Sequence, residues 1–159
     1  MRYLTAYYTD KGRRKAVNQD SLLVLREKYE KGEAVLAVIC DGMGGLEKGE
    51  VASQAVVRHF SEWFQEIFVQ IKEKEEEDFE DELYESWENL LQAAHRQIRQ
   101  YGKLNGIKIG TTVTAFLLAR GNYYFTHIGD CRLYELTEKI SCLTADHTLA
   151  SLGSMDNRN

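Results

Sequence analysis

The chain has 159 residues, of which 43% are hydrophobic and 28% are charged, a balance typical of one globular domain with its own core. Its formal net charge of −5 argues against a dominant role in binding nucleic acid, which requires a basic face. Because no apolar run is long enough to span a bilayer and the N-terminus lacks the apolar core of a signal peptide, we expect one domain, residues 1–159, in the cytoplasm, with no nucleic-acid or membrane partner.

The chain begins with a weak alternation of apolar and polar side chains over residues 2–9, which predicts a half-buried strand. Three cations follow at residues 13–15, shortly before Asp20, and the apolar residues 22–25 predict the next strand. A basic run of this kind is usually a solvated cluster at a turn. The alternative is a functional basic loop, because the three cations lie close to the carboxylate of Asp20 in the sequence.

An uninterrupted apolar run over residues 35–40 is rich in β-branched side chains and predicts a strand buried on both faces. It leads directly into Asp41 and a glycine-rich turn over residues 42–45. Glycines at this point let the backbone turn sharply or approach a ligand closely. The alternative is an ordinary turn that uses Asp and Gly for their backbone preferences.

Two long segments then carry apolar residues at the three-to-four spacing of amphipathic helices. The first begins at Gly49 and reaches Ile71; the second runs over residues 79–101, and Gly106 marks its exit. The charge-dense residues 72–82 between them predict a solvated link. We expect two antiparallel helices that pack against a sheet.

The last third of the chain predicts a meander of antiparallel strands, at residues 110–119, 123–128, 131–136 and 140–143. The order of strands, helices and again strands lacks the regular alternation of a parallel sheet, which indicates an α+β fold. We expect the helices to cover one face of one sheet. The other face then needs a second layer, such as a second sheet in a sandwich.

The three cysteines are an odd number and lack the spacing of a metal site, which argues against a disulfide framework and favours a reducing compartment. Cys40, Cys131 and Cys142 all lie in strand-like apolar runs. We therefore expect all three to be small core residues.

Three aspartates, Asp20, Asp41 and Asp130, each lie at or near the end of a predicted strand. A sandwich can bring such ends together, although spacing alone does not establish that it does. Mg²⁺ and Mn²⁺ prefer carboxylate oxygens, backbone carbonyls and waters, which an Asp-Gly turn supplies. Two such ions can activate water and hold a phosphoryl oxygen, so that in-line hydrolysis needs no protein nucleophile.

Five motifs carry a resemblance that covers nearly the whole chain: Asn18-Gln19-Asp20, Asp41-Gly42-Met43-Gly44-Gly45 followed by Gly49-Glu50-Val51-Ala52-Ser53, Gly110-Thr111-Thr112, Gly129-Asp130-Cys131-Arg132 and Asp146-His147. In this order they resemble the bacterial form of the metal-dependent protein serine/threonine phosphatases of type 2C. The resemblance implies an αββα four-layer sandwich with a two-metal centre between its sheets. It also implies hydrolysis of phosphoserine and phosphothreonine in proteins, opposed by a serine/threonine kinase in signalling.

The resemblance assigns roles to four residues. It implies that Asp41 bridges two Mn²⁺ or Mg²⁺ ions and that the carbonyl of Gly42 is a ligand to one of them. Asp20 matches the family's acidic residue that holds water at the metals. Asp130 matches the ligand of a third, weaker metal seen in bacterial members.

Two departures concern charge. Lys15 stands where the family places a phosphate-binding arginine, and a lysine is a point charge without the bidentate fork. The sequence leaves open whether Arg13 or Arg14 takes over this role. Gln19 stands where the family usually has a glutamate, and its amide can hold a water but adds no charge.

A third departure is length, because the family's catalytic domains commonly continue into a flap, further strands and helices, and two late metal aspartates. We therefore expect a domain that is incomplete at its C-terminus, with weakened metal binding and sheet edges that invite self-association. The alternative function is a non-catalytic, phosphatase-like module that binds a metal or a phosphoprotein without turnover.

Overall fold

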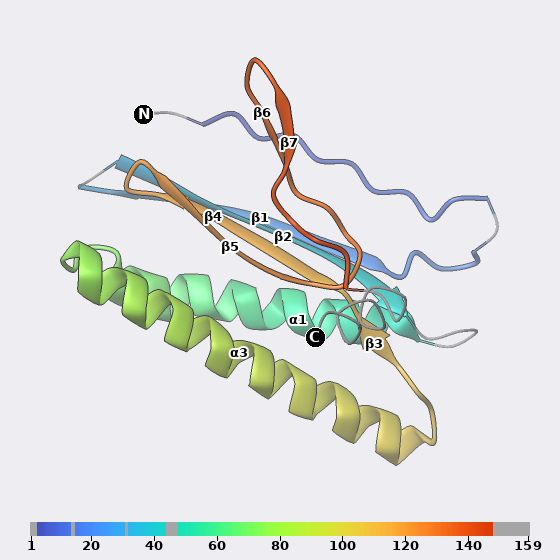
Figure 1. Cartoon of the computed structure of the whole chain (residues 1–159). Helices are drawn as coiled ribbons and strands as arrows, with labels where there is room; N and C mark the ends of the chain where they lie inside the picture. Colours follow the sequence, from blue (N-terminus) through green and yellow to red (C-terminus); the bar gives the residue numbers. More distant parts are fainter. Residues whose placement is uncertain (1–2, 14, 31, 44–47, 148–159) are drawn as a thin grey trace, which may run out of the picture.

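The computed structural model describes residues 3–13, 15–30, 32–43 and 48–147. Within them, a five-stranded antiparallel sheet is covered on one face by two long helices (Figure 1). A two-stranded hairpin and the N-terminal segment lie on the other side of this sheet (Figure 1). The α+β class and the one-sided helical cover predicted from the sequence are confirmed.

The main sheet consists of β1 (Asp20–Tyr29), β2 (Gly32–Met43), β3 (Gly110–Thr111), β4 (Val113–Ala119) and β5 (Asn122–Ile128). Its strand order is β1-β2-β4-β5, and β3 pairs with the end of β2. β6 (Tyr134–Leu136) and β7 (Ile140–Cys142) form the separate hairpin. β1 and β5 are therefore the edge strands of the main sheet.

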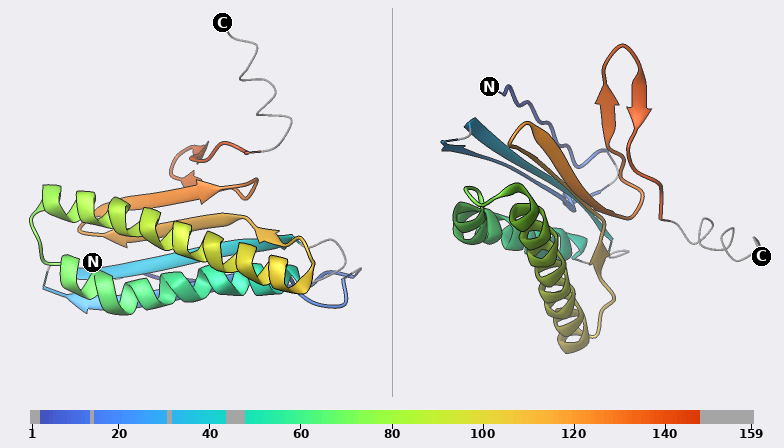
Figure 2. Two further views of the ribbon diagram at one scale, coloured as in Figure 1. Left: turned by 90° about the horizontal axis from the view of Figure 1, so that it is seen from below. Right: turned by 60° about the vertical axis from the view of Figure 1, so that its left-hand side comes forward.

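The helical layer consists of α1 (Gly49–Trp63), the π-helical turn η1 (Phe64–Phe68), α2 (Val69–Ile71) and α3 (Glu76–Asn105). α1 and α3 lie side by side over the sheet (Figure 2). The π-helical turn changes the expected stripe, because its wider turn rotates the side chains that follow. Phe68 is fully buried, whereas its neighbour Ile67 is 38% exposed.

The predicted link over residues 72–82 is wrong in its extent. α3 already begins at Glu76, and its first turn carries Glu76, Glu77 and Asp78. Acidic side chains in a first helical turn are stabilised by the helix dipole, so this charge density is compatible with helix as well as with a link. The exit is confirmed, since Gly106 caps α3 with a left-handed φ of 65°.

The core lies between the sheet and the helices. Leu36, Val38 and Cys40 of β2 are fully buried on the helical side. On the opposite face of the same strand Val35 is 3% exposed but Ile39 is 55% exposed, so the prediction of burial on both faces holds only for the first part of the run. Each large side chain buried in this way contributes about 1.5–3 kcal/mol.

Aromatic rings fill much of this core. Trp87 meets Phe60 and Trp63 edge-on, with both centroid distances at 5.6 Å, and Phe64 stacks on Phe68 at 4.8 Å. Two of these rings come from α1, one from α3 and two from η1. This cluster fixes the two helices relative to each other and so fixes where α1 begins beside the strand ends.

The predicted strand over residues 2–9 is not formed in the part of it that the structure describes. Leu4 and Tyr8 are exposed, and the segment is anchored at Tyr3, whose N–H donates to Glu33 at 3.0 Å and whose carbonyl accepts from Arg26 at 2.9 Å. A strand needs a neighbour to pair its backbone groups. No described strand pairs with this segment through a ladder of backbone hydrogen bonds.

Two other strand predictions are shortened. The run 110–119 is divided at Thr112, and the strand expected over 131–136 begins only at Tyr134. All three cysteines are free, but Cys142 in the small hairpin is exposed, so its expected place in the core is wrong. No helix of the described residues has both the length and the hydrophobicity to cross a membrane.

Candidate metal and phosphate site

Asp20 and Asp41 are direct partners in the pairing of β1 with β2. Asp20 begins β1, and Asp41 lies near the end of β2, so the hairpin brings together two carboxylates from opposite ends of its sequence. Side chains of directly opposite residues lie on the same face, with Cβ atoms about 4.5–5.5 Å apart. The face is the one that the helices leave open.

The electrostatic environment of Asp41 reflects this pairing. Burial raises the pKa of Asp41, and the charge of Asp20 raises it further. Lys15 lowers the same pKa, while the more weakly acting Asp130 raises it. The charges of Asp20, Asp130 and Lys15 therefore all affect the ionisation of Asp41. A positive charge nearby favours the ionised form of its carboxyl group.

The backbone around Asp41 is held by the segment between β3 and β4. The Asp41 N–H donates to Thr112 Oγ1 at 2.9 Å, and the Thr112 N–H donates to the Asp41 carbonyl at 2.9 Å. Thr111 Oγ1 donates to the same carbonyl at 3.1 Å. The sequence pointed to the Gly-Thr-Thr motif but not to this role, because a threonine hydroxyl gives no signal of its partner.

The glycines after Asp41 have a steric reason. A Cβ on Gly42 would overlap the carbonyl oxygens of Gly49 and Gln19, and a Cβ on Gly49 would lie 2.8 Å from the Gly42 carbonyl group. The Gly42 N–H donates to the Gln19 carbonyl at 3.1 Å. Two backbones thus cross here at a distance that only glycine permits. Gly44 and Gly45 lie outside the described residues.

A buried serine closes the same junction. Ser53 of α1 is fully buried, and its Oγ donates to the Gln19 carbonyl at 2.7 Å. The Oγ of Ser21 is 2.9 Å from it. Both predicted carboxylates therefore stand on backbone that hydrogen bonds fix from α1 and from Thr112.

Asp130 is exposed in the bend that follows β5. Its neighbour Gly129 has a φ of 118° and packs so closely that a Cβ would lie 2.6 Å from Thr112 Cγ2. Thr112 thus contacts the backbone of Asp41 on one side and the bend with Asp130 on the other. The charge of Asp130 raises the pKa of Asp41, but more weakly than the charge of Asp20 does.

The Asp146-His147 motif supports this bend. Arg132 donates two hydrogen bonds to Asp146, at 2.9 and 2.7 Å, and lowers the pKa of that carboxyl group. The His147 N–H donates to the Gly129 carbonyl at 2.7 Å, and the His147 ring lies 5.2 Å from that of His127. The motif therefore positions the backbone on which Asp130 stands.

Lys15 belongs to a cavity of about 430 Å³ beside Asp20. The residues that line it are Asp10, Lys11, Gly12, Arg13, Lys15, Asn18 and Asp20. Asn18 also accepts the Asp20 N–H through Oδ1 at 3.1 Å, which fixes the start of β1. The predicted basic loop and the predicted carboxylates thus form one continuous surface; Arg14 lies outside the described residues.

The donor set suits a hard divalent cation in chemistry, with two paired carboxylates and the carbonyl of Gly42 next to them. Among the residues that the structure describes, no three His, Cys, Asp or Glu side chains group closely enough to hold a metal ion. Asp20 and Asp41 therefore form the centre of the site, and Asp130 stands farther out.

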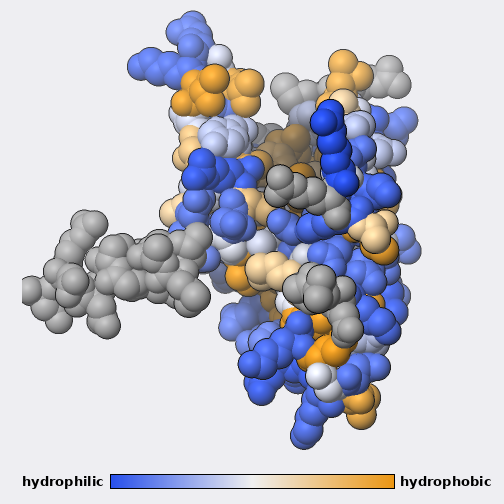
Figure 3. Space-filling model, turned by 90° about the vertical axis from the view of Figure 1, so that its right-hand side faces the viewer, coloured by the Kyte–Doolittle hydropathy of each residue, from blue (hydrophilic) through white to orange (hydrophobic). Residues whose placement is uncertain are grey.

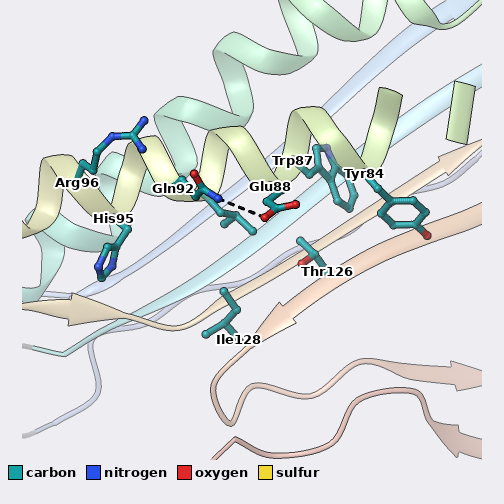
Figure 4. A pocket seen from close by; sticks show the side chains of 9 residues that line it. Tyr84, Trp87, Glu88, Gln92, His95, Arg96, Thr126 and Ile128 are labelled. Atoms are coloured by element: carbon teal, nitrogen blue, oxygen red, sulfur yellow. Dashed lines mark hydrogen bonds between the residues drawn. The ribbon is translucent and has the colours of Figure 1, made fainter. Parts of the chain in front are cut away.

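A larger groove of about 540 Å³ lies elsewhere, between α3 and β5 (Figure 4). Tyr84, Trp87 and Ile128 give it apolar walls, and Gln92 donates to Glu88 at 3.2 Å across its helical side. It opens on the helical side of the sheet and contains none of the paired carboxylates. The larger of the two cavities is therefore not the one that contains the candidate carboxylate Asp20.

The antiparallel sheet with two long helices on one face agrees with the α+β class that the sequence predicts. The family described as Protein phosphatase 2C matches residues 9–153, and the chain belongs to this family. The resemblance drawn from the five motifs is confirmed.

Among curated proteins, the chain is 30% identical over 149 residues to a serine/threonine phosphatase stp from Listeria innocua, a match covering 90% of this chain and 54% of the relative. It is 27% identical over 146 residues to protein phosphatase PhpP of Streptococcus pneumoniae, again covering 90% of this chain and 54% of the relative. The chain thus spans about half the length of the curated relatives it matches.

Solved structures show the same fold. The serine/threonine phosphatase of S. agalactiae superposes with a TM-score of 0.70 at 28% identity, over 96% of this chain and 59% of that one. The catalytic domain of the phosphatase PstP in complex with two manganese ions gives a TM-score of 0.70 at 28% identity, over 94% of this chain and 58% of that one. The α+β architecture is that of type 2C phosphatases.

Proposed function

We propose that this chain forms the N-terminal part of a metal-dependent phosphatase that hydrolyses phosphoserine and phosphothreonine in proteins. The observation that supports this most directly is the register pairing of Asp20 with Asp41 next to the Gly42–Gly49 crossing. Paired carboxylates on fixed backbone are the ligands that Mg²⁺ and Mn²⁺ prefer. Membership in the Protein phosphatase 2C family supports the same reaction.

In this proposal Asp41 and the Gly42 carbonyl hold two Mn²⁺ or Mg²⁺ ions, Asp20 orients water beside them, and Asp130 serves a third, weaker site. The bound ions supply Lewis-acid activation of water and neutralise charge on the phosphoryl group. Burial and then the charge of Asp20 raise the pKa of Asp41, so both disfavour its ionised form, and a bound cation would favour that form.

Lys15 is proposed to hold the phosphoryl oxygens. It is exposed, lines the cavity next to Asp20 and lowers the pKa of Asp41. An ammonium group donates to phosphate as a point charge, without the planar fork of arginine. Lys15 therefore neutralises and positions the phosphate on the side of the carboxylates where residues 10–13 line the cavity.

The wider context is part of the proposal. We place residues 1–159 in a single cytoplasmic domain that acts in signalling opposite a serine/threonine kinase. The edge strands β1 and β5 are the proposed sites of self-association, because an edge strand presents unpaired backbone groups to a second chain.

The test is Mn²⁺-dependent hydrolysis of an aryl phosphate and of a phosphothreonine peptide by the 159-residue chain. Asp41→Asn should abolish metal-dependent turnover, because it removes a central ligand charge. Asp81→Asn, an exposed aspartate of α3, is the control that makes the same chemical change away from the site. Turnover that persists without metal or in Asp41→Asn would refute the proposal.

A non-catalytic module that binds a metal or a phosphoprotein is the second candidate. One observation favours it: among the described residues, no three His, Cys, Asp or Glu side chains group closely enough to hold a metal ion. Calorimetric binding of Mn²⁺ or of a phosphopeptide without turnover would support this candidate. Turnover that depends on Asp41 would exclude it.

A further inference from the structure

The loop that precedes β1 forms one wall of a cavity of about 430 Å³. The cavity adjoins the proposed catalytic surface, because Asp20 lines it and is the register partner of Asp41. Residues 10–13 and 15 lie at the end of the sheet where β1 begins (Figure 1). A peptide whose phosphate lies at Asp20 and Asp41 therefore has this loop beside its flanking residues.

Three cations of this loop, Lys11, Arg13 and Lys15, are exposed and line the cavity. None of them takes part in an ion pair within the described residues, whereas Arg26, Lys72, Arg120 and Arg132 elsewhere in the fold are paired. The positive charges of the loop are thus directed to solvent and to what enters the cavity.

The one carboxylate on the loop, that of Asp10, accepts hydrogen bonds from neighbouring residues. Asp10 accepts the Gly12 N–H at 2.7 Å and the Tyr8 hydroxyl at 3.4 Å, so both of its oxygens are used within the loop. These bonds shape the turn that presents the cations. The remaining acid of the cavity, Asp20, faces the proposed metal site.

The charge of the loop contrasts with that of the chain, whose net charge is −5. The surface around it, viewed from this end of the sheet, is largely hydrophilic (Figure 3). An acidic peptide is repelled by the molecule as a whole and attracted at this loop, so the field favours one orientation of approach.

We propose that the cavity beside Asp20 binds acidic side chains that flank the phosphorylated residue, so that the preferred substrates are phosphopeptides with Asp or Glu next to the phosphate. This inference rests on the proposed phosphatase function. Lys15 lies close enough to Asp41 to lower the pKa of its carboxyl group, and we assign Lys15 to the phosphate group of the substrate. Lys11 and Arg13 are then the cations available to the flanking acids, and Lys11 is the one that the experiment changes.

The experiment uses three phosphothreonine peptides that differ only in their flanking residues, which are Glu, Gln or Lys on both sides. Phosphate release in the presence of Mn²⁺ gives kcat/KM, and fluorescence anisotropy of labelled peptides gives Kd whether or not turnover occurs. We expect kcat/KM and affinity to fall in the order Glu, Gln, Lys, with a preference that weakens as salt is added.

Lys11→Glu is the diagnostic variant. It should lower kcat/KM for the Glu peptide roughly 5- to 10-fold, as expected for reversing one exposed charge near a charged ligand, and leave hydrolysis of an aryl phosphate unchanged. Lys28→Glu is the matched control, since it makes the same charge change on β1 roughly 25 Å from Asp20. It should leave the order of the three peptides intact.

Equal use of the Glu and Gln peptides, or a Lys11→Glu variant that still prefers the Glu peptide, would overturn the proposal. If neither the aryl phosphate nor any peptide is hydrolysed, the phosphatase function itself fails, and the anisotropy measurement still decides on specificity. Tighter binding of the Glu peptide that Lys11→Glu removes would then support the acidic-peptide site, and equal binding of the three peptides would refute it.

Discussion

Thr112 satisfies both backbone hydrogen-bonding groups of Asp41: its hydroxyl accepts the Asp41 N–H at 2.9 Å, and its own N–H donates to the Asp41 carbonyl at 2.9 Å. Thr112 is 2% exposed, so water cannot replace either bond. The same side chain packs against Gly129, next to Asp130. One buried threonine therefore links the segments that carry two of the three aspartates.

Thr112→Val should lower the free energy of unfolding by about 1–3 kcal/mol, because the isosteric valine leaves the buried Asp41 N–H without an acceptor. Urea unfolding followed by circular dichroism measures this change. Thr112→Ser retains the hydroxyl and loses only a methyl group, so its cost should stay near 1 kcal/mol. A valine variant as stable as wild type would show that the hydroxyl does not hold Asp41.

Gly49→Ala should destabilise the chain by about 1–3 kcal/mol or prevent folding, because the new Cβ would lie 2.8 Å from the Gly42 carbonyl group. Alanine favours a helix by up to about 1 kcal/mol relative to glycine, so helix propensity alone predicts the opposite sign. Gly110→Ala is the control, since its Cβ would meet only Met43 Cε, at 3.9 Å. Thermal unfolding of the two variants separates steric overlap from a general effect of alanine.

The pH dependence of stability should carry the signature of Asp41. Burial and the neighbouring Asp20 raise its folded pKa, so the native state binds more protons than the unfolded state as pH rises from the ordinary aspartate value of about 3.9 to the raised value. In metal-free buffer the free energy of unfolding should therefore fall through this window and stay lowered at neutral pH.

Asp41→Asn should remove this fall and raise metal-free stability at neutral pH.

Glu33 provides the opposite case, because the Tyr3 N–H and then Arg26 lower its pKa. Its contribution to stability is therefore present at neutral pH and is lost as the solution becomes acidic. Glu33→Gln should therefore reduce stability at neutral pH. Urea unfolding at several pH values, with a chelator present, checks both signs. If both variants changed stability in the same direction at neutral pH, one of the two assignments would be wrong.

Arg120→Lys should cost about 1–2 kcal/mol, although it keeps the charge. The side chain of Arg120 is 6% exposed, its guanidinium lies 4.8 Å from the centre of the Phe79 ring, and it donates to the Lys74 carbonyl at 2.7 Å. Lysine cannot reproduce the planar group that makes these contacts together. Arg58→Lys, in an exposed pair with Glu62 at 3.8 Å, should change stability by less than about 0.5 kcal/mol. Equal effects in urea unfolding would contradict this.

Much of the fold followed from local pattern. The alternation and apolar runs located the main strands, and the three-to-four spacing located both helices, because each pattern depends only on which side of one element faces the core. The errors occurred where a partner was decisive. Residues 3–9 have the pattern of a strand but pair with no described strand, and the π-helical turn leaves Ile67 38% exposed within an otherwise buried apolar stripe.

The candidate site divides in the same way. Asp20, Asp41, Asp130 and Lys15 were predicted from motifs, and their placement in one electrostatic field is what the structure added. Thr112 and Ser53 were missed as supporting residues. Their hydroxyl groups bond to backbone far away in sequence, at Asp41 and Gln19, and nothing in the local sequence of either residue specifies that partner.

Local periodicity and motifs in the sequence predicted most of the elements, the family and the residue types available for chemistry. Three features followed only from the folded chain: Asp20 lies opposite Asp41, the Gly42 and Gly49 backbones cross in contact, and residues 10–13 and 15 line a cavity with Asp20. The reason is strand register: alternation fixes which side chains share a face, but only the pairing of whole strands, set by the turn between them and by core packing, fixes which residues are opposite.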